Sequence, residues 1–316
     1  MSSIYPEHGV RPNSGTNNVP RGTAGIEGVG GPVVRLAQVA SDTYLSKILE
    51  SHRARARRDR RDAATLAAAA EAAPPTRGFA AGLESAAGGE LAVIAEVKRR
   101  SPSKGDIATD LDPAALAAQY QAGGARGVSV LTDAEFFGGS PDDLAAARAG
   151  CSLPVLRKDF TVCAADVFDA RIMGADAVLL IVAALSDDEL VGLLTVAQEL
   201  ALDSLVEVHD AAELDRALDA GASLVGVNQR DLTTFEVDRG RAVRLAEHIP
   251  AEVVAVAESG IEGVEDARAL ADAGYQAVLV GESLLRASDR RAGVAALSGH
   301  RVGARVAPPS LGTRRS

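Results

Sequence analysis

Between residues 91 and 297, short apolar segments alternate eight times with amphipathic segments rich in Ala and Leu. Continuous apolar runs separated by helical runs predict parallel strands that are buried on both faces. Eight such units within about 200 residues match a (β/α)8 barrel, or TIM barrel. The predicted strands span residues 91–97, 127–131, 154–157, 177–182, 204–208, 224–227, 253–257 and 277–280, and the predicted helices span residues 113–122, 141–149, 164–173, 187–201, 211–220, 239–248, 264–273 and 289–297.

The alternative fold for such a pattern is a doubly wound open sheet. The Gly-x-Gly-x-x-Gly fingerprint that marks its dinucleotide-binding version is absent after the first predicted strand. An Ala-Gly or Met-Gly step recurs where a predicted helix meets the next strand, at residues 122–125, 173–176, 220–222 and 273–275. Glycine accepts the left-handed conformation that ends a helix, so this recurrence favours the barrel.

The barrel pattern leaves a segment at each end of the chain. Residues 1–42 are rich in Gly, Pro, Asn and Ser and are predicted to form a disordered tail. Residues 43–90 begin with a helical pattern that ends before Pro74, which predicts an N-terminal helical extension to the catalytic barrel of residues 91–298. Extension and barrel together span residues 43–298, and residues 299–316 are predicted to form a disordered C-terminal tail.

Composition excludes several classes of function. The net charge of −10 argues against a nucleic-acid partner, which needs a basic footprint. Cys151 and Cys163 have no Cys or His at metal-ligand spacing, so no metal site is predicted. The N-terminus lacks the pattern of a signal peptide, and no apolar run approaches the roughly 20 residues of a membrane span. These features predict a cytoplasmic protein without a membrane partner.

The chemistry of a barrel enzyme lies at the C-terminal ends of its strands. Each charged group there could belong to an ordinary salt bridge, but buried strands should not end in so many unless the groups meet or serve a site. Seven of the eight predicted strands carry polar groups at or just beyond their ends: Glu96 and Lys98, Thr132 and Asp133, Arg157 to Asp159, Glu207 and His209, Asn228 with Arg230 and Asp231, Glu258 and Ser259, and Glu282 with Ser283.

Two subsets of these residues have a chemical meaning. Lys98, Lys158 and Glu207 come from the first, third and fifth strands, and alternate strands contribute to one interior layer. Two ammonium groups with a carboxylate between them could perform acid–base chemistry and hold an anion. Small residues after the seventh and eighth strands, at 259–260 and 281, leave backbone N–H groups free to hold a phosphate.

Eight sequence segments, in order along the chain, resemble the indole-3-glycerol phosphate synthase family. The resemblance covers residues 43–297. The segments are IAEVKRRSPSKG (94–105), SVLTD with FFGGS (129–140), PVLRKDF (154–160), GADAVLLIVAAL (174–185), LVEVH (205–209), GVNQRDL (226–232), AESGI (257–261) and VLVGESLL (278–285).

The resemblance implies a carboxy-lyase of tryptophan biosynthesis with a (β/α)8 barrel and an extra N-terminal helical segment. Its substrate would be the phosphorylated small molecule 1-(2-carboxyphenylamino)-1-deoxyribulose 5-phosphate. Ring closure, decarboxylation and dehydration would convert it into indole-3-glycerol phosphate. The family needs no metal or organic cofactor. We expect a monomer or a weak homo-oligomer.

By motif, Lys158 resembles the general acid that protonates the substrate ketone. Lys98 resembles the lysine that holds the anthranilate carboxylate and can act as an acid in the dehydration. Glu207 resembles the general base, and Glu96 orients Lys98. The other matching residues would hold the substrate. Asn228, Glu258 and Arg230 would lie beside its hydroxyls, and Arg100 would bind it from the basic segment at residues 99–105. Phe137 and Phe160 would surround its aromatic ring, and its phosphate would be held by Ser101, Ser259, Gly260, Gly281 and the Glu282 backbone.

Three alternatives stay open at this point. Related phosphoribosyl isomerase barrels share the phosphate site but use a Cys/Asp or Asp/Asp pair, whereas this chain has Lys98, Lys158 and Glu207. A non-catalytic phosphate-binding barrel would be favoured if one of those three were replaced. A paralogous synthase that supplies indole to specialised metabolism would have the same motifs.

Overall fold

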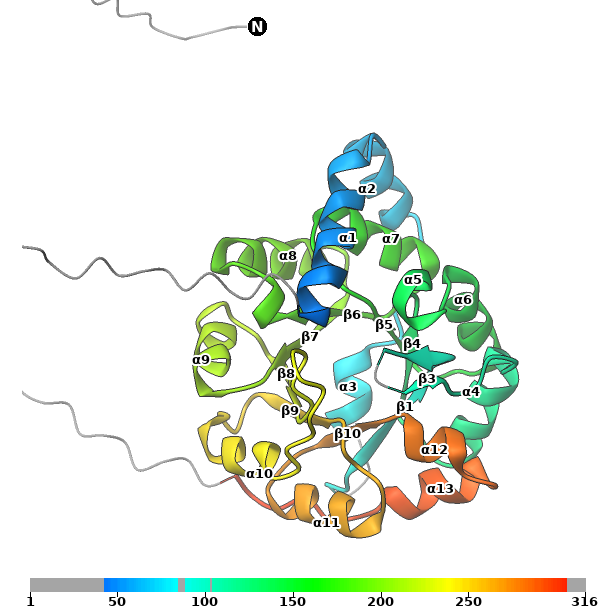
Figure 1. Ribbon diagram of the computed structural model, residues 1–316, viewed down its shortest axis with the longest axis vertical. Coiled ribbons are helices and arrows are strands. Elements are labelled where there is room, and N and C mark those ends of the chain that lie inside the picture. Colours follow the sequence, from blue (N-terminus) through cyan, green and yellow to red (C-terminus); the bar gives the residue numbers. More distant parts are fainter. Residues whose placement is uncertain (1–42, 85–88, 103, 306–316) are drawn as a thin grey trace, which may run out of the picture. The chain divides into compact units, whose positions relative to one another are not determined.

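The computed structural model describes residues 43–84, 89–102 and 104–305. The predicted tails at 1–42 and 306–316 lie outside the described residues. Eight parallel strands form a closed barrel in which β1 pairs with both β4 and β10 (Figure 1), as predicted. The strands are β1 (Ala92–Val97), β4 (Gly127–Leu131), β5 (Val155–Lys158), β6 (Ala177–Ile181), β7 (Asp203–Val208), β8 (Leu224–Asn228), β9 (Val254–Glu258) and β10 (Ala277–Val280).

Helices follow the strands and surround the barrel (Figure 1). Several begin where a polar side chain accepts a hydrogen bond from the first turn, as Asp112, Ser140 and Ser186 do. Buried Leu, Ala and Val side chains inside and around the strands form most of the core, which suits a chain with 3% aromatic residues. The outer helices are α4 (Pro113–Ala122), α6 (Pro141–Gly150), α7 (Ala164–Met173), α8 (Asp187–Glu199), α9 (Ala211–Asp219), α10 (Arg241–Leu245), α11 (Val264–Asp272) and α13 (Arg290–Leu297).

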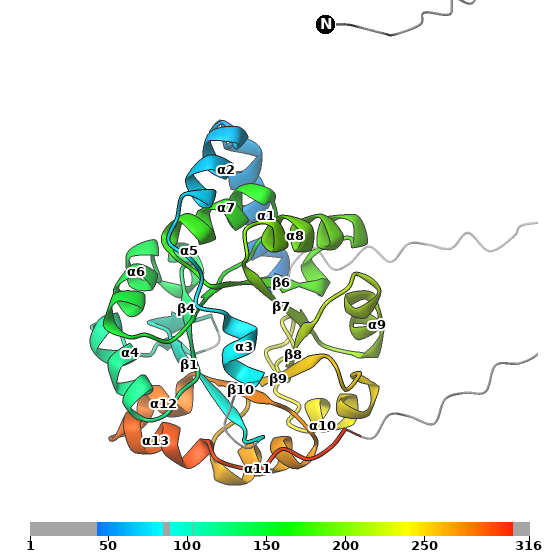
Figure 2. The same cartoon turned by 180° about the vertical axis from the view of Figure 1, so that it is seen from behind.

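The N-terminal extension forms two helices, α1 (Tyr44–Arg58) and α2 (Ala63–Glu71), where the pattern predicts one helical segment. Asp59 leaves the helical conformation at the end of α1, and Asp62 then caps α2 through the Thr65 N–H. A third helix, α3 (Phe79–Glu84), follows; Figure 2 places it over the centre of the barrel on the far side from α1. Phe79 is fully buried there, so α3 closes the N-terminal end of the barrel.

Short elements at the strand ends were not predicted. They comprise the antiparallel pair β2 (Arg100–Ser101) and β3 (Gly105–Asp106), the helices α5 (Ala134–Phe137) and α12 (Glu282–Arg286), and a 3-10 turn at Val182–Ala184. All are five residues or fewer, which is too short for a periodic signal. The helix predicted at 239–248 is α10 followed by a 3-10 turn at Ala246–His248. Within the described residues, no helix is long and apolar enough to cross a membrane.

The structure differs from the predicted C-terminal tail over residues 299–305, which pack against the barrel. The His300 carbonyl accepts from the Leu91 N–H at 2.7 Å, and the Val302 N–H donates to the Gly89 carbonyl at 2.8 Å. The Arg305 guanidinium donates to the carbonyls of Gly274 at 2.9 Å and Pro250 at 3.0 Å. Single backbone and arginine contacts of this kind leave no periodic pattern in the sequence.

Candidate active site

A cavity of about 730 Å³ opens at the C-terminal ends of the strands. Its volume suits a small phosphorylated substrate. The cavity brings together all the predicted site residues except Arg100: Glu96, Lys98, Ser101, Phe137, Lys158, Phe160, Glu207, Asn228, Arg230, Glu258, Ser259, Gly260, Gly281 and Glu282.

Lys158, the last residue of β5, lies between two buried carboxyl groups. Its Nζ is 3.0 Å from Oε2 of Glu207 on β7 and 3.2 Å from Oε2 of Glu258 at the end of β9. Burial alone would lower the pKa of Lys158, but the charges of Glu207 and Glu258 raise it above its ordinary value. The side chain is therefore an ammonium, and it lines the cavity.

The two carboxyl groups beside Lys158 titrate apart. Burial raises the pKa of Glu258 to about 7; the nearby Glu207 charge adds to this shift, and Lys158 opposes it. Burial acts on Glu207 in the same direction, but Lys158 and His209 together hold the pKa of Glu207 below its ordinary value. At neutral pH Glu207 is thus a carboxylate, while Glu258 is present in both its protonated and its ionised form.

Two further side chains hold Glu207. Asn228 Nδ2 donates to Glu207 Oε1 at 3.0 Å, and its own Oδ1 accepts from the Arg230 N–H at 3.0 Å. His209 Nε2 lies 3.5 Å from the same Glu207 oxygen, and its Nδ1 lies 3.0 Å from Glu213. The sequence placed His209 near a strand end but assigned it no role. Its i, i+2 spacing from Glu207, which puts two strand residues on one face, is the signal that was available.

Lys98 forms an ion pair with Glu96, and both line the cavity. Glu96 is buried on β1, and Lys98 follows that strand. The predicted meeting of Lys98, Lys158 and Glu207 is thus partial: Lys158 contacts Glu207 directly, while Lys98 pairs with Glu96 on the wall of the same cavity. A Cβ at Gly281 would lie 2.5 Å from Glu96 Oε1 and 3.2 Å from Lys98 Nζ, so glycine there leaves room for the pair.

Four of the five predicted phosphate residues follow β9 and β10, and the fifth, Ser101, lines the same cavity from β2. Ser259 and Gly260 have left-handed backbones, with φ of 66° and 71°. Gly281 precedes α12, and the Glu282 carboxylate pairs with Arg286 at 3.0 Å. Backbone N–H groups at the start of a helix can bind an anion. The cations Lys104, Arg239 and Arg286 also line the cavity. Of these, only Lys104 lies within a segment that resembles the family, residues 94–105.

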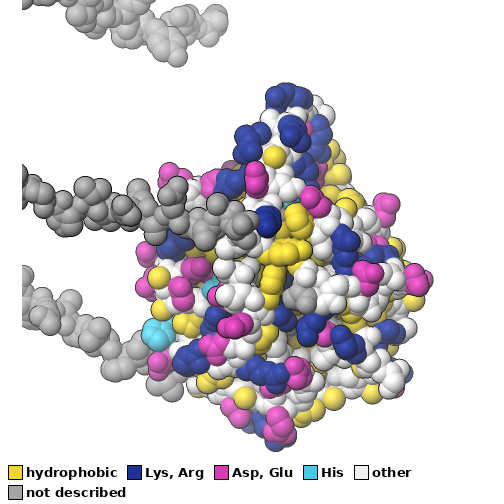
Figure 3. Space-filling model, in the orientation of Figure 1, with side chains coloured by type: hydrophobic (Ala, Val, Ile, Leu, Met, Phe, Trp, Pro, Cys, Tyr) yellow, Lys and Arg dark blue, Asp and Glu magenta, His cyan; other side chains and the backbone are white. Residues whose placement is uncertain are grey.

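Phe137 of α5 and Phe160 after β5 form an apolar wall of the cavity, with ring centroids 6.4 Å apart. Nearer the start of α1, the Tyr44 ring contacts Phe136 and Phe235, with centroids 6.3 and 5.2 Å away. Apolar side chains gather in the centre of the face in Figure 3. The cavity is thus lined by aromatic side chains as well as by charged ones.

Arg100 does not line the cavity. Its guanidinium donates to the carbonyls of Ala134 and Glu135, the first two residues of α5. Successive residues of a strand face opposite sides, so Arg100 of β2 turns away when Ser101 faces the cavity. Only the resemblance of residues 94–105 to the family suggested a role for Arg100 in substrate binding.

Comparison with known proteins agrees with this geometry. The family model for indole-3-glycerol phosphate synthase matches residues 45–297. "Indole-3-glycerol phosphate synthase 2" of Streptomyces coelicolor is 54% identical over 233 residues, which cover 74% of this chain and 89% of that protein. Proteins named indole-3-glycerol phosphate synthase from Mycobacteroides abscessus and Mycobacterium avium are 50% and 51% identical, covering 82% and 81% of this chain and 95% and 93% of theirs. This chain belongs to the indole-3-glycerol phosphate synthase family.

Proposed function

We propose that this protein converts 1-(2-carboxyphenylamino)-1-deoxyribulose 5-phosphate into indole-3-glycerol phosphate, CO2 and water, as a lyase of tryptophan biosynthesis. The observation that carries the proposal is the Lys158 ammonium held between Glu207 and Glu258 at the base of a cavity with an apolar wall. The family match supports it, and nothing in the comparisons favours a non-catalytic barrel or a specialised-metabolism paralogue.

The first step joins the aromatic carbon that bears the carboxylate to the ketone carbon of the substrate. The ketone oxygen gains negative charge as this bond forms, so a proton donor beside it lowers the barrier. Lys158 fits this role because it is an ammonium at the cavity base. The Glu96–Lys98 pair would place Lys98 against the substrate carboxylate before it leaves as CO2.

Loss of CO2 restores the aromatic ring, and dehydration completes the indole. Dehydration removes a hydroxyl from one carbon and a proton from its neighbour, so it needs both an acid and a base. Glu207 is the ionised carboxylate of the site and fits the base. Lys98 or Lys158 would protonate the departing hydroxyl. Asn228, Arg230 and Glu258 would hold the sugar hydroxyls.

The remaining predicted residues would bind the two ends of the substrate. Phe137 and Phe160 would pack on its aromatic ring. The phosphate would lie at the opposite end of the cavity, against Ser101, Ser259, Gly260, Gly281 and the Glu282 backbone N–H. We also infer that residues 43–298 act as one catalytic unit, in the cytoplasm, as a monomer or a weak homo-oligomer.

The proposal is tested by incubating the purified protein with the carboxyphenylamino substrate. We expect indole fluorescence to appear together with one CO2 per molecule converted. Lys158→Ala should lower kcat by about 10²- to 10⁴-fold, the contribution of one positioned acid, while circular dichroism stays unchanged. Arg268→Ala, on the surface of α11, is the matched control. Absence of CO2 release by the wild type would refute the function, and a Lys158→Ala rate within a few-fold of wild type would refute the role of Lys158.

A further inference from the structure

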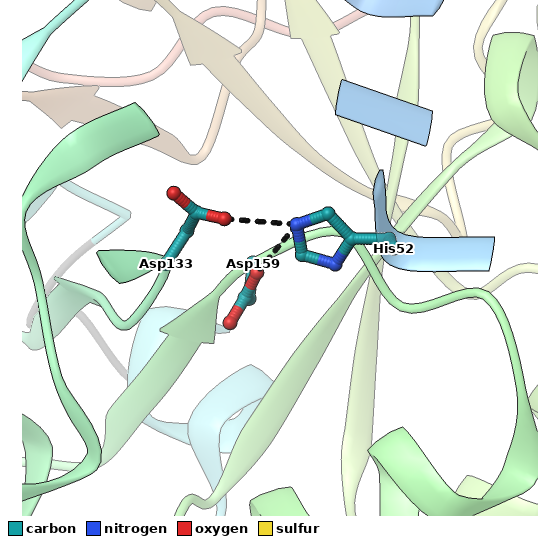
Figure 4. A group of neighbouring side chains, drawn as sticks. All are labelled: His52, Asp133 and Asp159. Carbon is teal, nitrogen blue, oxygen red and sulfur yellow. Dashed lines mark hydrogen bonds and ion pairs between the residues drawn. The ribbon is translucent and has the colours of Figure 1, made fainter. Parts of the chain in front are cut away.

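The N-terminal helix α1 carries a buried histidine that contacts residues at the C-terminal ends of the barrel strands. His52 is 2% exposed, and its Nε2 lies 2.9 Å from Asp133 Oδ2 and 3.8 Å from Asp159 Oδ1 (Figure 4). Asp133 follows β4 and Asp159 follows β5, so the ring contacts the ends of two neighbouring strands. No role in the proposed reaction has been assigned to His52.

Each of the two aspartates holds a segment that carries one phenylalanine of the apolar wall. Asp133 caps α5: its Oδ1 accepts from the N–H groups of Phe136 at 2.6 Å and Phe137 at 3.1 Å. His52 binds the other oxygen of the same carboxylate. The orientation of α5, and with it that of the Phe137 ring, thus depends on the Asp133 carboxylate, whose other oxygen is hydrogen-bonded to His52.

The contact with the second phenylalanine is more direct. Asp159 Oδ1 accepts from the Phe160 N–H at 2.8 Å. The His52 ring also packs on the Phe160 ring, with centroids 5.5 Å apart and planes tilted by 51°. His52 therefore contacts Phe160 through its ring as well as through Asp159.

The cluster is a hydrogen-bond network rather than a cation site. Arg55 Nη2 lies 2.9 Å from His52 Nδ1 and can only donate, so Nδ1 accepts and Nε2 carries the hydrogen that faces Asp133. Asp159 Oδ2 is bound by Arg157 at 2.9 Å and by the Thr132 hydroxyl at 2.5 Å. A metal ion among these groups would face a buried guanidinium and displace bonds that are already made.

We propose that His52 is a positioning residue for the aromatic end of the substrate, through which α1 sets the spacing of Phe137 and Phe160. The inference rests on the proposed function for the identity of the ring. The contacts of His52, with Asp133, Asp159, Arg55 and Phe160, include neither the group of Lys158, Glu207 and Glu258 nor the predicted phosphate residues at 259–260 and 281–282. Its loss should therefore weaken binding of an aromatic carboxylate and leave binding of phosphate unchanged.

The test measures binding of two probes, 2-aminobenzoate and inorganic phosphate, to the full chain by calorimetry. His52→Ala should raise the Kd for 2-aminobenzoate about tenfold, the usual effect of losing one buried hydrogen bond, with the Kd for phosphate within twofold of wild type. His52→Gln, whose amide N–H can reach the place of Nε2, should restore most of the affinity. The matched control, His248→Ala, replaces an exposed histidine beyond α10.

With the full substrate, His52→Ala should raise KM and leave kcat within about threefold. Asp133→Asn provides a second variant because asparagine still caps α5 but loses its charge toward His52; it should reproduce the selective effect even if His52→Ala fails to fold. Equal weakening of both probes, unchanged binding of 2-aminobenzoate, or loss of affinity on chelation of a metal would each overturn the inference. Binding can be measured without turnover, so these outcomes stay distinct from a wild type that releases no CO2.

Discussion

Glu258→Gln should make the protein more stable at alkaline pH and less active. Folded Glu258 keeps its proton up to about pH 7, whereas the carboxyl of the unfolded chain releases it near pH 4.5. Folding therefore takes up a proton between these values, and the free energy of unfolding falls as pH rises from 4.5 to 7. At about 1.4 kcal/mol for each tenfold change in proton affinity, the ionised carboxyl costs the folded state about 3 kcal/mol at pH 8.

Glutamine stays neutral at every pH, so the variant avoids this cost. Its amide oxygen can accept from Lys158 as Glu258 Oε2 does. Its amide nitrogen would replace Glu258 Oε1, which has no hydrogen-bond partner among the described residues, and an unpaired buried group is unfavourable. The expected gain at pH 8 is therefore about 1 to 3 kcal/mol, and at pH 5 it should be below about 1 kcal/mol.

Urea unfolding followed by far-ultraviolet circular dichroism, at pH 5 and pH 8, measures both differences. Glu265→Gln is the control, because that α11 side chain is 86% exposed and its removal should give the same difference at both pH values. The kcat/KM of Glu258→Gln should fall at least tenfold if Glu258 holds substrate hydroxyls. A variant less stable than wild type at pH 8, or an equal difference at both pH values, would refute the reasoning.

Two further substitutions test the space beside the Glu96–Lys98 pair and the attachment of residues 299–305 to the barrel. Gly281→Ala should raise KM about tenfold at unchanged fold, because its Cβ would lie 2.5 Å from Glu96 Oε1 and would disturb the pair with Lys98; steady-state kinetics measure this, and a wild-type KM would contradict it. Arg305→Ala should lower the free energy of unfolding by about 2 to 4 kcal/mol with unchanged kcat, because its guanidinium donates to several carbonyls at residues 250–276. Urea unfolding measures this change, and a loss below about 0.5 kcal/mol would contradict the prediction.

Strand positions could be predicted because their apolar runs have few other uses in a chain of this composition. Three strands nevertheless extend one residue beyond their predicted C-terminal ends, and in each case the extra residue lines the cavity. β5, β8 and β9 end in Lys158, Asn228 and Glu258, each one residue beyond the predicted end. A polar side chain indicates a loop when the sequence is examined alone, whereas the backbone continues to pair within the barrel. The cavity residues for which we propose a role in these strands are thus their last residues.

Long-range pairing could not be predicted from spacing. His52 lies in a charged helical segment, and nothing local indicates that it meets Asp133, 81 residues away. Arg100 carries the same charge as its neighbours in a basic segment, and only the strand β2 determines that it faces away from the cavity. In both cases the side-chain direction follows from tertiary packing, which a linear pattern does not contain.

Gly226 links the fold of the barrel to the chemistry of the cavity. It lies in the middle of β8, where glycine normally weakens a strand. A Cβ at this position would lie 2.1 Å from Glu258 Oε1 and 3.2 Å from Leu205 Cδ1. The missing side chain therefore makes the space in which the Glu258 carboxyl is buried beside Lys158. Burial is the main cause of the raised pKa of Glu258, so the protonation of this carboxyl near pH 7 depends on a glycine that is not among the residues lining the cavity.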